Sequence, residues 1–279
     1  MDGADHRRAS HAVWEAMAPG WDERHAYFEE IARPVTEKML ELLDPSPGDA
    51  LLDLAAGTGV VGFSAAALVG PTGRVIVSDF ASAMVDVARR RAEELGLDNV
   101  DCRVLDAERL ELPDRSVDGV LCRWGYMLMA DAPAALRETR RVLRADGRVA
   151  CAVFAGPEQN PWAALPSRVL GQRGHIPPAK ADAPGILALA NPDRLRRLFT
   201  EAGLASAAIE EVAFVFRFAG MDDYWEFLNG AAGAIAMVLS RLGDDERERV
   251  RAEIAAALGA VGGTGEIELP ATSLVLSAS

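Results

Sequence analysis

The stretch Leu51-Leu52-Asp53-Leu54-Ala55-Ala56-Gly57-Thr58-Gly59 decides the fold of this chain. The run at 50–54 is apolar apart from one aspartate and too short for a helix, so it predicts a buried strand of a parallel sheet. Small apolar residues at 60–68 predict a helix packed closely against that strand. Gly57 and Gly59 lack a Cβ, so the turn can take left-handed backbone and present main-chain amides to a ligand. This order of strand, glycine turn and helix indicates a nucleotide-binding site.

Asp53 is the acid inside this strand. Because an unpaired buried carboxylate is costly, we expect Asp53 at the carboxyl end of the strand. There it would accept hydrogen bonds from the backbone of the glycine turn or from a cationic group of a ligand. A purely structural brace of the turn is the alternative. The buried acid strengthens the glycine pattern as a sign of a binding site.

The composition favours one large domain, or a domain with a lid, that binds a small molecule. Half of the 279 residues are hydrophobic, which is enough for a sizeable core. The net charge of -13 argues against non-specific nucleic-acid binding, which needs a basic field. No apolar run approaches the roughly 20 residues of a membrane span, and the first residues lack the apolar segment of a signal peptide. We therefore expect a cytoplasmic protein with no nucleic-acid or membrane partner.

The cysteines and histidines give no sign of a metal site. Cys102, Cys122 and Cys151 fall in expected strands without the spacing of metal ligands, which predicts reduced core cysteines. The four histidines form no metal-type cluster. We expect no bound metal.

Three successive strands are expected to end in acids: Asp53 in the strand at 50–54, Asp79 in the strand at 73–80, and Asp106 directly after the strand at 100–105. A fourth strand, at 117–122, runs into Arg123. Helices are expected at 81–95 and around 136–143, and a fifth strand at 148–154 after the turn Ala145-Asp146-Gly147. Strands that alternate with helices predict an α/β, doubly wound parallel sheet. The carboxyl ends of such strands form the ligand crevice, so Asp53, Asp79 and Asp106 should meet there.

Two adenosine-binding chemistries fit the glycines. Gly57-x-Gly59-x-x-Gly62 also matches the dinucleotide fingerprint, and Asp79 stands where an acid can accept hydrogen bonds from ribose hydroxyls. A nicotinamide enzyme, however, needs a hydride-transfer apparatus. The chain has only Lys38 and Lys180, and no Tyr-x-x-x-Lys pair.

An ordered set of motifs resembles the class I S-adenosylmethionine-dependent methyltransferases, in particular the small-molecule branch with the ubiquinone and menaquinone biosynthesis C-methyltransferases. The motifs are Asp53-Leu54-Ala55-Ala56-Gly57-Thr58-Gly59, Asp79, Asp106-Ala107-Glu108 before Leu112-Pro113, Asp118, and Arg137-Glu138-x-x-Arg141-Val142-Leu143-Arg144-x-Asp146-Gly147. The resemblance covers about residues 10–155. It implies a mostly parallel seven-stranded sheet with helical lid insertions, and S-adenosylmethionine as cofactor with S-adenosylhomocysteine as product. It also implies methyl transfer to a small-molecule acceptor by in-line displacement.

The resemblance assigns a role to each expected cofactor residue. Asp53 orders the glycine turn and binds the methionine amino group. The backbone carbonyl of Arg123 binds the same amino group. Asp79 binds the ribose hydroxyls. The methionine and ribose side is assigned to Ala55, Gly57, Thr58 and Gly59, adenine packing to Phe80 and Met84, and the adenine edge to Asp106 and Ala107.

Four regions are expected along the chain. Residues 1–45 are expected to form an N-terminal helical flap in which Trp21 and Tyr27 contact the ligand; ordinary packed helices are the alternative. Within this region, a helix at 34–43 leads into the first strand. Residues 46–155 form the cofactor-binding core. The Pro- and Gly-rich segment 156–190, which contains Trp162 and His175, is expected to cover the substrate side. Residues 191–279 complete the sheet, with an antiparallel last strand near 269–276.

A helical insertion at 222–262 is expected to wall the substrate pocket; a homodimer contact or additional packing is the alternative. The catalytic residues are unknown from the sequence. His25, Tyr126 and His175 are the candidates for a general base if the acceptor must lose a proton. A non-catalytic methyltransferase-fold protein remains a further alternative.

Overall fold

The computed structural model describes residues 3–176, 183–205, 208–259 and 265–279. Seven strands form one sheet in the order β3-β2-β1-β4-β5-β7-β6. The strands are β1 (Ala50–Leu54), β2 (Arg74–Asp79), β3 (Val100–Val104), β4 (Val117–Arg123), β5 (Leu143–Phe154), β6 (Ile209–Phe218) and β7 (Ile267–Ala278). β1 to β5 pair in parallel, and β7 runs antiparallel to β5 and β6. The predicted doubly wound, mostly parallel seven-stranded sheet is confirmed.

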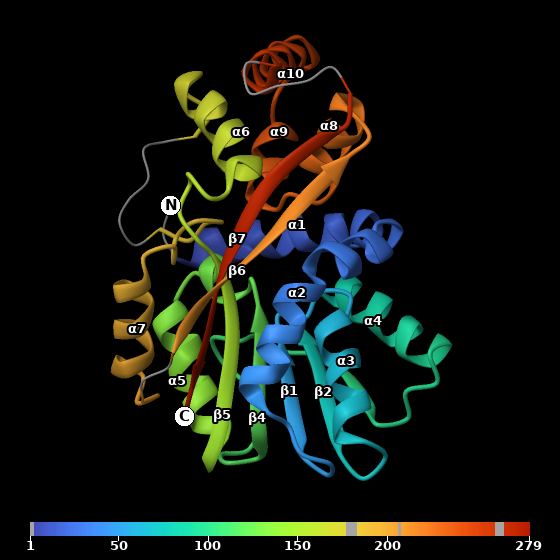
Figure 1. Ribbon diagram of the computed structural model, residues 1–279, viewed down its shortest axis with the longest axis vertical. Helices are drawn as coiled ribbons and strands as arrows, with labels where there is room; N and C mark the ends of the chain where they lie inside the picture. Colours follow the sequence, from blue (N-terminus) through green and yellow to red (C-terminus); the bar gives the residue numbers. More distant parts are fainter. Residues whose placement is uncertain (1–2, 177–182, 206–207, 260–264) are drawn as a thin grey trace.

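Helices cover both faces of the sheet and one of its ends (Figure 1). They are α1 (Gly3–Glu23), α2 (His25–Leu43), α3 (Val60–Val69), α4 (Ser82–Glu94), α5 (Ala132–Val142), α6 (Pro161–Gln172), α7 (Pro192–Glu201), α8 (Met221–Gly230), α9 (Ala234–Leu239) and α10 (Asp244–Gly259). The connections through α3 and α4 run in one direction along the sheet and the connection through α5 runs in the other. Because such crossovers are right-handed, α5 lies on the face opposite α3 and α4.

The strands β6 and β7 extend beyond the end of β5. β5 ends at Phe154, opposite Ser273, whereas β7 continues to Ile267, paired with Phe218. This extension carries a group of four helices, α6, α8, α9 and α10, which we call the roof (Figure 1). The helix α1 lies across the molecule between the roof and the sheet. The carboxyl ends of the parallel strands are therefore covered.

The roof is fixed to the sheet by buried hydrogen bonds. Asn160, fully buried just before α6, donates to the carbonyl oxygens of Ala155 (3.1 Å) and Thr272 (3.0 Å) and accepts from the Thr272 amide (3.1 Å). The Tyr224 hydroxyl of α8 donates to the Trp162 carbonyl of α6 at 2.6 Å. Buried bonds of this kind are costly to leave unmade, so they hold α6 and α8 in fixed positions.

Some element boundaries differ from the predictions. The segment 156–190 contains the helix α6, which its proline content concealed, and part of that segment (177–182) lies outside the described residues. α2 begins at His25 and runs through Pro34, instead of starting there. β5 begins at Leu143, so the expected turn at 145–147 lies inside a strand whose register against β4 shifts. α9 was not predicted, and residues 260–262 of the expected insertion lie outside the described part of the chain.

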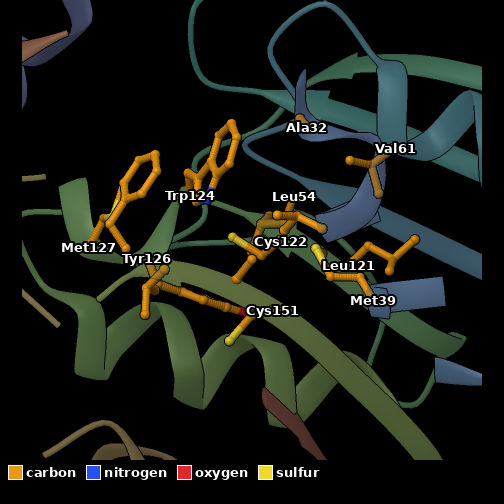
Figure 2. Close-up of a cluster of buried hydrophobic side chains, with 14 of the residues drawn as sticks. Ala32, Met39, Leu54, Val61, Leu121, Cys122, Trp124, Tyr126, Met127 and Cys151 are labelled. Atoms are coloured by element: carbon orange, nitrogen blue, oxygen red, sulfur yellow. The ribbon is translucent and has the colours of Figure 1, made fainter. Parts of the chain in front are cut away.

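The core lies where β1, β4 and β5 meet α2 and α3 (Figure 2). Cys122 and Cys151 are fully buried there and occupy neighbouring positions of β4 and β5. Cys102 on β3 is half-buried, and all three cysteines are free. The prediction of reduced cysteines agrees with this arrangement.

Candidate functional site

One pocket opens at the carboxyl ends of the parallel strands, under α1 and the roof. It encloses about 1330 Å³ including its mouth. Nine of the twelve residues predicted for the cofactor line it: Trp21, Asp53, Ala55, Gly57, Asp79, Phe80, Asp106, Ala107 and Arg123. The expectation that the acids of three successive strands meet in one crevice is confirmed by this geometry.

Three predicted residues do not line the pocket. Thr58 is buried beneath the turn, with 3% of its surface exposed. Gly59 directly precedes α3 and faces the Phe63 ring, because a Cβ there would lie 2.4 Å from that ring. Met84 is fully buried in the interface between α4 and α1, where it packs near Met17.

The glycine turn exposes bare main chain at one position. Gly57 has φ of +56°, in the left-handed region, and a Cβ at this residue would meet no heavy atom within 4 Å. Its amide donates to Asp79 Oδ2 at 2.9 Å, and the Ala56 amide donates to the Ser78 carbonyl at 2.9 Å. The turn is thus held from the β2 side while its Gly57 face stays open to the pocket.

Asp53 has one satisfied and one unsatisfied carboxylate oxygen. Oδ2 accepts a hydrogen bond of 2.7 Å from the Gly62 amide in the first turn of α3. Oδ1 is buried and has no partner among the described residues. Burial raises the pKa of this carboxyl to about 7. A buried carboxylate oxygen without a donor, beside a pocket, fits a cationic ligand group such as an ammonium.

The prediction that Asp53 accepts from the glycine turn was wrong, because its partner is Gly62. Asp79 braces the turn instead: Oδ2 accepts from Gly57 and Oδ1 accepts from the Ala81 amide at 3.0 Å. Burial raises the pKa of Asp79 as well. Each carboxylate oxygen keeps a further lone pair, so Asp79 can still accept from a ligand in the pocket.

The helix α1 closes the adenine side predicted around Asp106 and Ala107. Arg7 of α1 forms an ion pair with Glu108 and lies 3.8 Å from Asp106 Oδ2. Glu15 of α1 accepts from the Ser82 hydroxyl at 3.0 Å and the Ala83 amide at 3.2 Å, at the start of α4. The sequence did not indicate that α1 would supply polar groups to this rim.

Arg123 places its side chain, as well as its backbone, at the pocket. Nη1 donates to Thr36 Oγ1 at 2.6 Å, and the guanidinium carbon lies 5.0 Å from the centre of the Trp124 ring. Burial lowers the pKa of Arg123 to about 10, against the attraction of Asp53. The resemblance had assigned only the backbone carbonyl of this residue.

Much of the remaining lining is aromatic. Trp21 stacks on Phe28 at 4.1 Å between ring centres, and Trp124 stacks on Phe154 at 4.8 Å. The roof adds Trp162 and Phe227, and β6 adds Phe216. Trp124 was not predicted; its only signal was its position directly after the fourth strand. Trp162 lies where the covering segment was expected to face the substrate.

None of the three base candidates lines the pocket. His25 Nδ1 bonds to the Asp22 carbonyl at 2.8 Å, and His175 Nε2 bonds to Glu246 Oε1 at 2.7 Å in a half-buried ion-pair cluster outside the pocket. The Tyr126 hydroxyl bonds to Thr139 Oγ1 at 2.7 Å in the core, and Figure 2 shows this side chain pointing away from Trp124 toward Cys151. The histidine that does line the pocket is His6 of α1, with Nε2 at 3.3 Å from the Leu128 carbonyl.

Comparisons with known proteins give the family. The model of the ubiE/COQ5 methyltransferase family matches residues 12–216. The chain belongs to this family.

Several curated relatives match about half of the chain. Nocamycin O-methyltransferase of Saccharothrix syringae is 40% identical over 144 residues, 50% of this chain and 50% of the relative. The ubiquinone/menaquinone biosynthesis C-methyltransferase UbiE of Pseudoalteromonas translucida is 39% identical over 112 residues, 40% of this chain and 45% of the relative. Aklanonic acid methyltransferase DauC of Streptomyces sp. strain C5 is 35% identical over 121 residues, 43% of this chain and 55% of the relative. The chain thus spans about half the length of the curated relatives it matches.

Solved structures share the fold at low identity. Geranyl diphosphate C-methyltransferase of Streptomyces coelicolor A3(2) aligns with a TM-score of 0.55 at 17% identity, covering 90% of this chain and 79% of that one. The [4+2]-cyclase SpnF aligns with a TM-score of 0.54 at 19% identity, covering 88% of this chain and 79% of that one. At such identities the likeness concerns the fold alone. Among the described residues, no helix is long and apolar enough to cross a membrane.

Proposed function

We propose that this protein transfers the methyl group of S-adenosylmethionine to a small-molecule acceptor by in-line displacement. The observation that carries the proposal is the unpartnered Oδ1 of Asp53 beside the open main chain of Gly57, with Asp79 and Asp106 lining the same pocket. These groups match an amino-acid ammonium, a close backbone contact, a ribose and an adenine edge in that order. Membership of the ubiE/COQ5 family supports the same cofactor.

The residues would hold the cofactor along the strand ends. Asp53 would bind its ammonium group, Asp79 its ribose hydroxyls, and Asp106 with the Ala107 amide its adenine edge. Phe80 would pack against the adenine. Thr58, Gly59 and Met84 lie behind the pocket wall, so in this proposal they shape the site without touching the cofactor.

Bound S-adenosylmethionine supplies a methyl group already activated on a sulfonium. The chain itself needs to bring the acceptor atom into line with that methyl group and to keep water out. The aromatic walls from β4, α6 and α8 and the cover of α1 do both. Because no base candidate from the sequence lines the pocket, the proposal assigns the rate to positioning rather than to proton removal by His25, Tyr126 or His175.

The lining also suggests the kind of acceptor. Eight aromatic side chains line the pocket besides Phe80, and they come from α1, α2, the sheet and the roof: Trp14, Trp21, Phe28, Trp124, Phe154, Trp162, Phe216 and Phe227. Such walls favour a flat, largely apolar acceptor. The relatives named for nocamycin and aklanonic acid support a natural-product acceptor. We further propose that the protein acts in the cytoplasm, which the three free cysteines support.

Calorimetry tests the cofactor assignment. We expect S-adenosylhomocysteine to bind with one site per chain and NAD to show no heat of binding. The reverse pattern would favour a nicotinamide enzyme. Mass spectrometry of a panel of aromatic acceptors, incubated with protein and S-adenosylmethionine, should then show a gain of one methyl group. Cofactor binding without methylation of any acceptor would favour a binding or regulatory protein.

A further inference from the structure

Arg123 is a cation of the pocket lining whose guanidinium has unused donors. Arginine carries five N–H groups, and the one hydrogen bond of this side chain is the 2.6 Å bond to Thr36 Oγ1. Among the described residues, no carboxylate forms an ion pair with it. The residue is half-buried and lines the pocket. Its remaining donors are therefore unpaired in a residue that borders the cavity.

Two neighbours fix the orientation of this fork. The α2 hydroxyl of Thr36 holds Nη1, and the Trp124 ring covers the guanidinium at 5.0 Å. A planar guanidinium held in this way loses little freedom when it binds a second planar group. Its geometry matches a carboxylate, which can accept two parallel N–H bonds.

The charges around the site also leave room for an anion. Asp53 and, to a smaller extent, Glu29 attract Arg123, but neither forms an ion pair with it, and Oδ1 of Asp53 is still unpartnered. The pocket thus presents a cation with free donors and an anion with a free acceptor on the same lining. If Arg123 served only to balance Asp53, a direct ion pair would satisfy both groups, and the structure does not contain one.

We propose that Arg123 binds the carboxylate of an organic molecule in this pocket. The inference rests on the proposed function, because two carboxylates would reach the pocket in a methyl transfer. One is the carboxylate at the amino-acid end of the cofactor, and the other is an acid group on the acceptor. Both ligands would present a carboxylate to Arg123, and two arms of one experiment distinguish between them.

The first arm compares S-adenosylhomocysteine with its decarboxylated analogue, S-adenosyl-3-thiopropylamine, by calorimetry. If Arg123 binds the cofactor carboxylate, the wild-type protein binds the intact compound about 10- to 100-fold more tightly, the range for charge-assisted hydrogen bonds. Arg123→Met removes that preference by weakening the intact compound alone. Arg123→Lys, which keeps the charge but loses the fork, retains part of it.

The second arm uses protein saturated with S-adenosylhomocysteine and compares 1-naphthoate with 1-naphthamide, measured by quenching of tryptophan fluorescence. If Arg123 binds an acceptor acid, wild type prefers the naphthoate about tenfold or more, as expected for one charged hydrogen bond, and Arg123→Met abolishes the preference. Arg91→Met is the matched control. It removes a half-buried arginine of α4 outside the pocket lining, so it should leave both preferences unchanged.

A carboxylate preference that disappears in Arg123→Met, in either arm, supports the proposal and names the source. Should that variant not fold, the reduced preference of Arg123→Lys carries the same meaning. Wild-type protein that prefers neither carboxylate overturns the proposal, as does a preference that both Arg123 variants keep. Failure of S-adenosylhomocysteine to bind wild-type protein counts against the proposed function instead, whereas tight binding without a carboxylate preference counts against Arg123 alone.

Discussion

The substitution Gly57→Ala separates the folding role of the glycine turn from its binding role. In the structure, a Cβ on Gly57 would point into open space, with no heavy atom within 4 Å. In the proposed complex that space holds the cofactor. The variant should therefore fold, and it should bind S-adenosylhomocysteine poorly.

The stability cost follows from the backbone alone. Gly57 has φ of +56°, and a side chain in left-handed backbone costs roughly 1–2 kcal/mol. No clash adds to this figure. The amide bond to Asp79 Oδ2 at 2.9 Å can stay in place, because the substitution leaves the backbone nitrogen intact. On the binding side, a methyl group between main chain and ligand should weaken affinity by at least about tenfold, or about 1.4 kcal/mol.

Gly59→Ala is the matched control on the same turn. Its Cβ would lie 2.4 Å from the Phe63 ring, with φ of +91°, and away from the pocket. Overpacking of this kind costs typically about 1–3 kcal/mol in addition to the backbone cost. We expect Gly59→Ala to lose more stability than Gly57→Ala and to lose less affinity once folded.

Urea denaturation followed by tryptophan fluorescence gives the stabilities, and calorimetry with S-adenosylhomocysteine gives the affinities. The two variants should fall in opposite order in the two measurements. Wild-type affinity in Gly57→Ala would refute the idea that ligand main-chain contact occurs at this residue. Equal losses of stability and affinity in both variants would show that the turn acts only through folding.

Asp79→Ala should weaken binding of S-adenosylhomocysteine by about 1–3 kcal/mol and also lower the urea midpoint, because the amides of Gly57 and Ala81 lose their carboxylate acceptor. The raised pKa of Asp53, about 7, predicts that this affinity increases from pH 6 to pH 8 as the carboxylate ionises; Asp53→Asn should flatten the calorimetric profile. Stability depends on pH in the opposite direction. Because the pKa of Asp53 in the folded protein lies above its ordinary 3.8, the free energy of unfolding should fall between about pH 4 and pH 7. A wild-type plot of unfolding free energy against pH that is no steeper than that of Asp53→Asn would contradict this prediction. Thiol reagents should modify Cys102 first in the native protein, since the other two cysteines are fully buried; a count of three fast thiols before urea is added would contradict the structure.

The parallel half of the fold could be predicted because its strands end in acids. Asp53, Asp79 and Asp106 follow short apolar runs separated by helical segments, and only one sheet topology brings such ends together. Which amide each acid meets was beyond the sequence. The Gly62 amide lies within reach of Asp53 because α3 packs closely on β1, and that distance depends on tertiary packing.

The acceptor side was less predictable. Trp124 reaches the pocket because its indole nitrogen is tied to Ser273 of β7 at 2.9 Å, a contact between residues far apart in the sequence. The helix α6 forms despite Pro166 because the Asn160 bonds and buried contacts of its apolar face outweigh propensity. Local composition indicated a covering segment here but not its conformation.

Because strands β6 and β7 extend beyond the rest of the sheet, the pocket lining comes from two distant parts of the chain. The residues proposed to hold the cofactor all lie within 53–125. Trp162, Phe216 and Phe227, by contrast, belong to the antiparallel edge of the sheet or to the helices that it carries. In the proposed reaction, replacing side chains along that wall would change the shape offered to an acceptor, while the residues proposed to hold the cofactor keep their own supports. Such a layout would let one cofactor site serve new acceptors through changes confined to a single edge of the sheet.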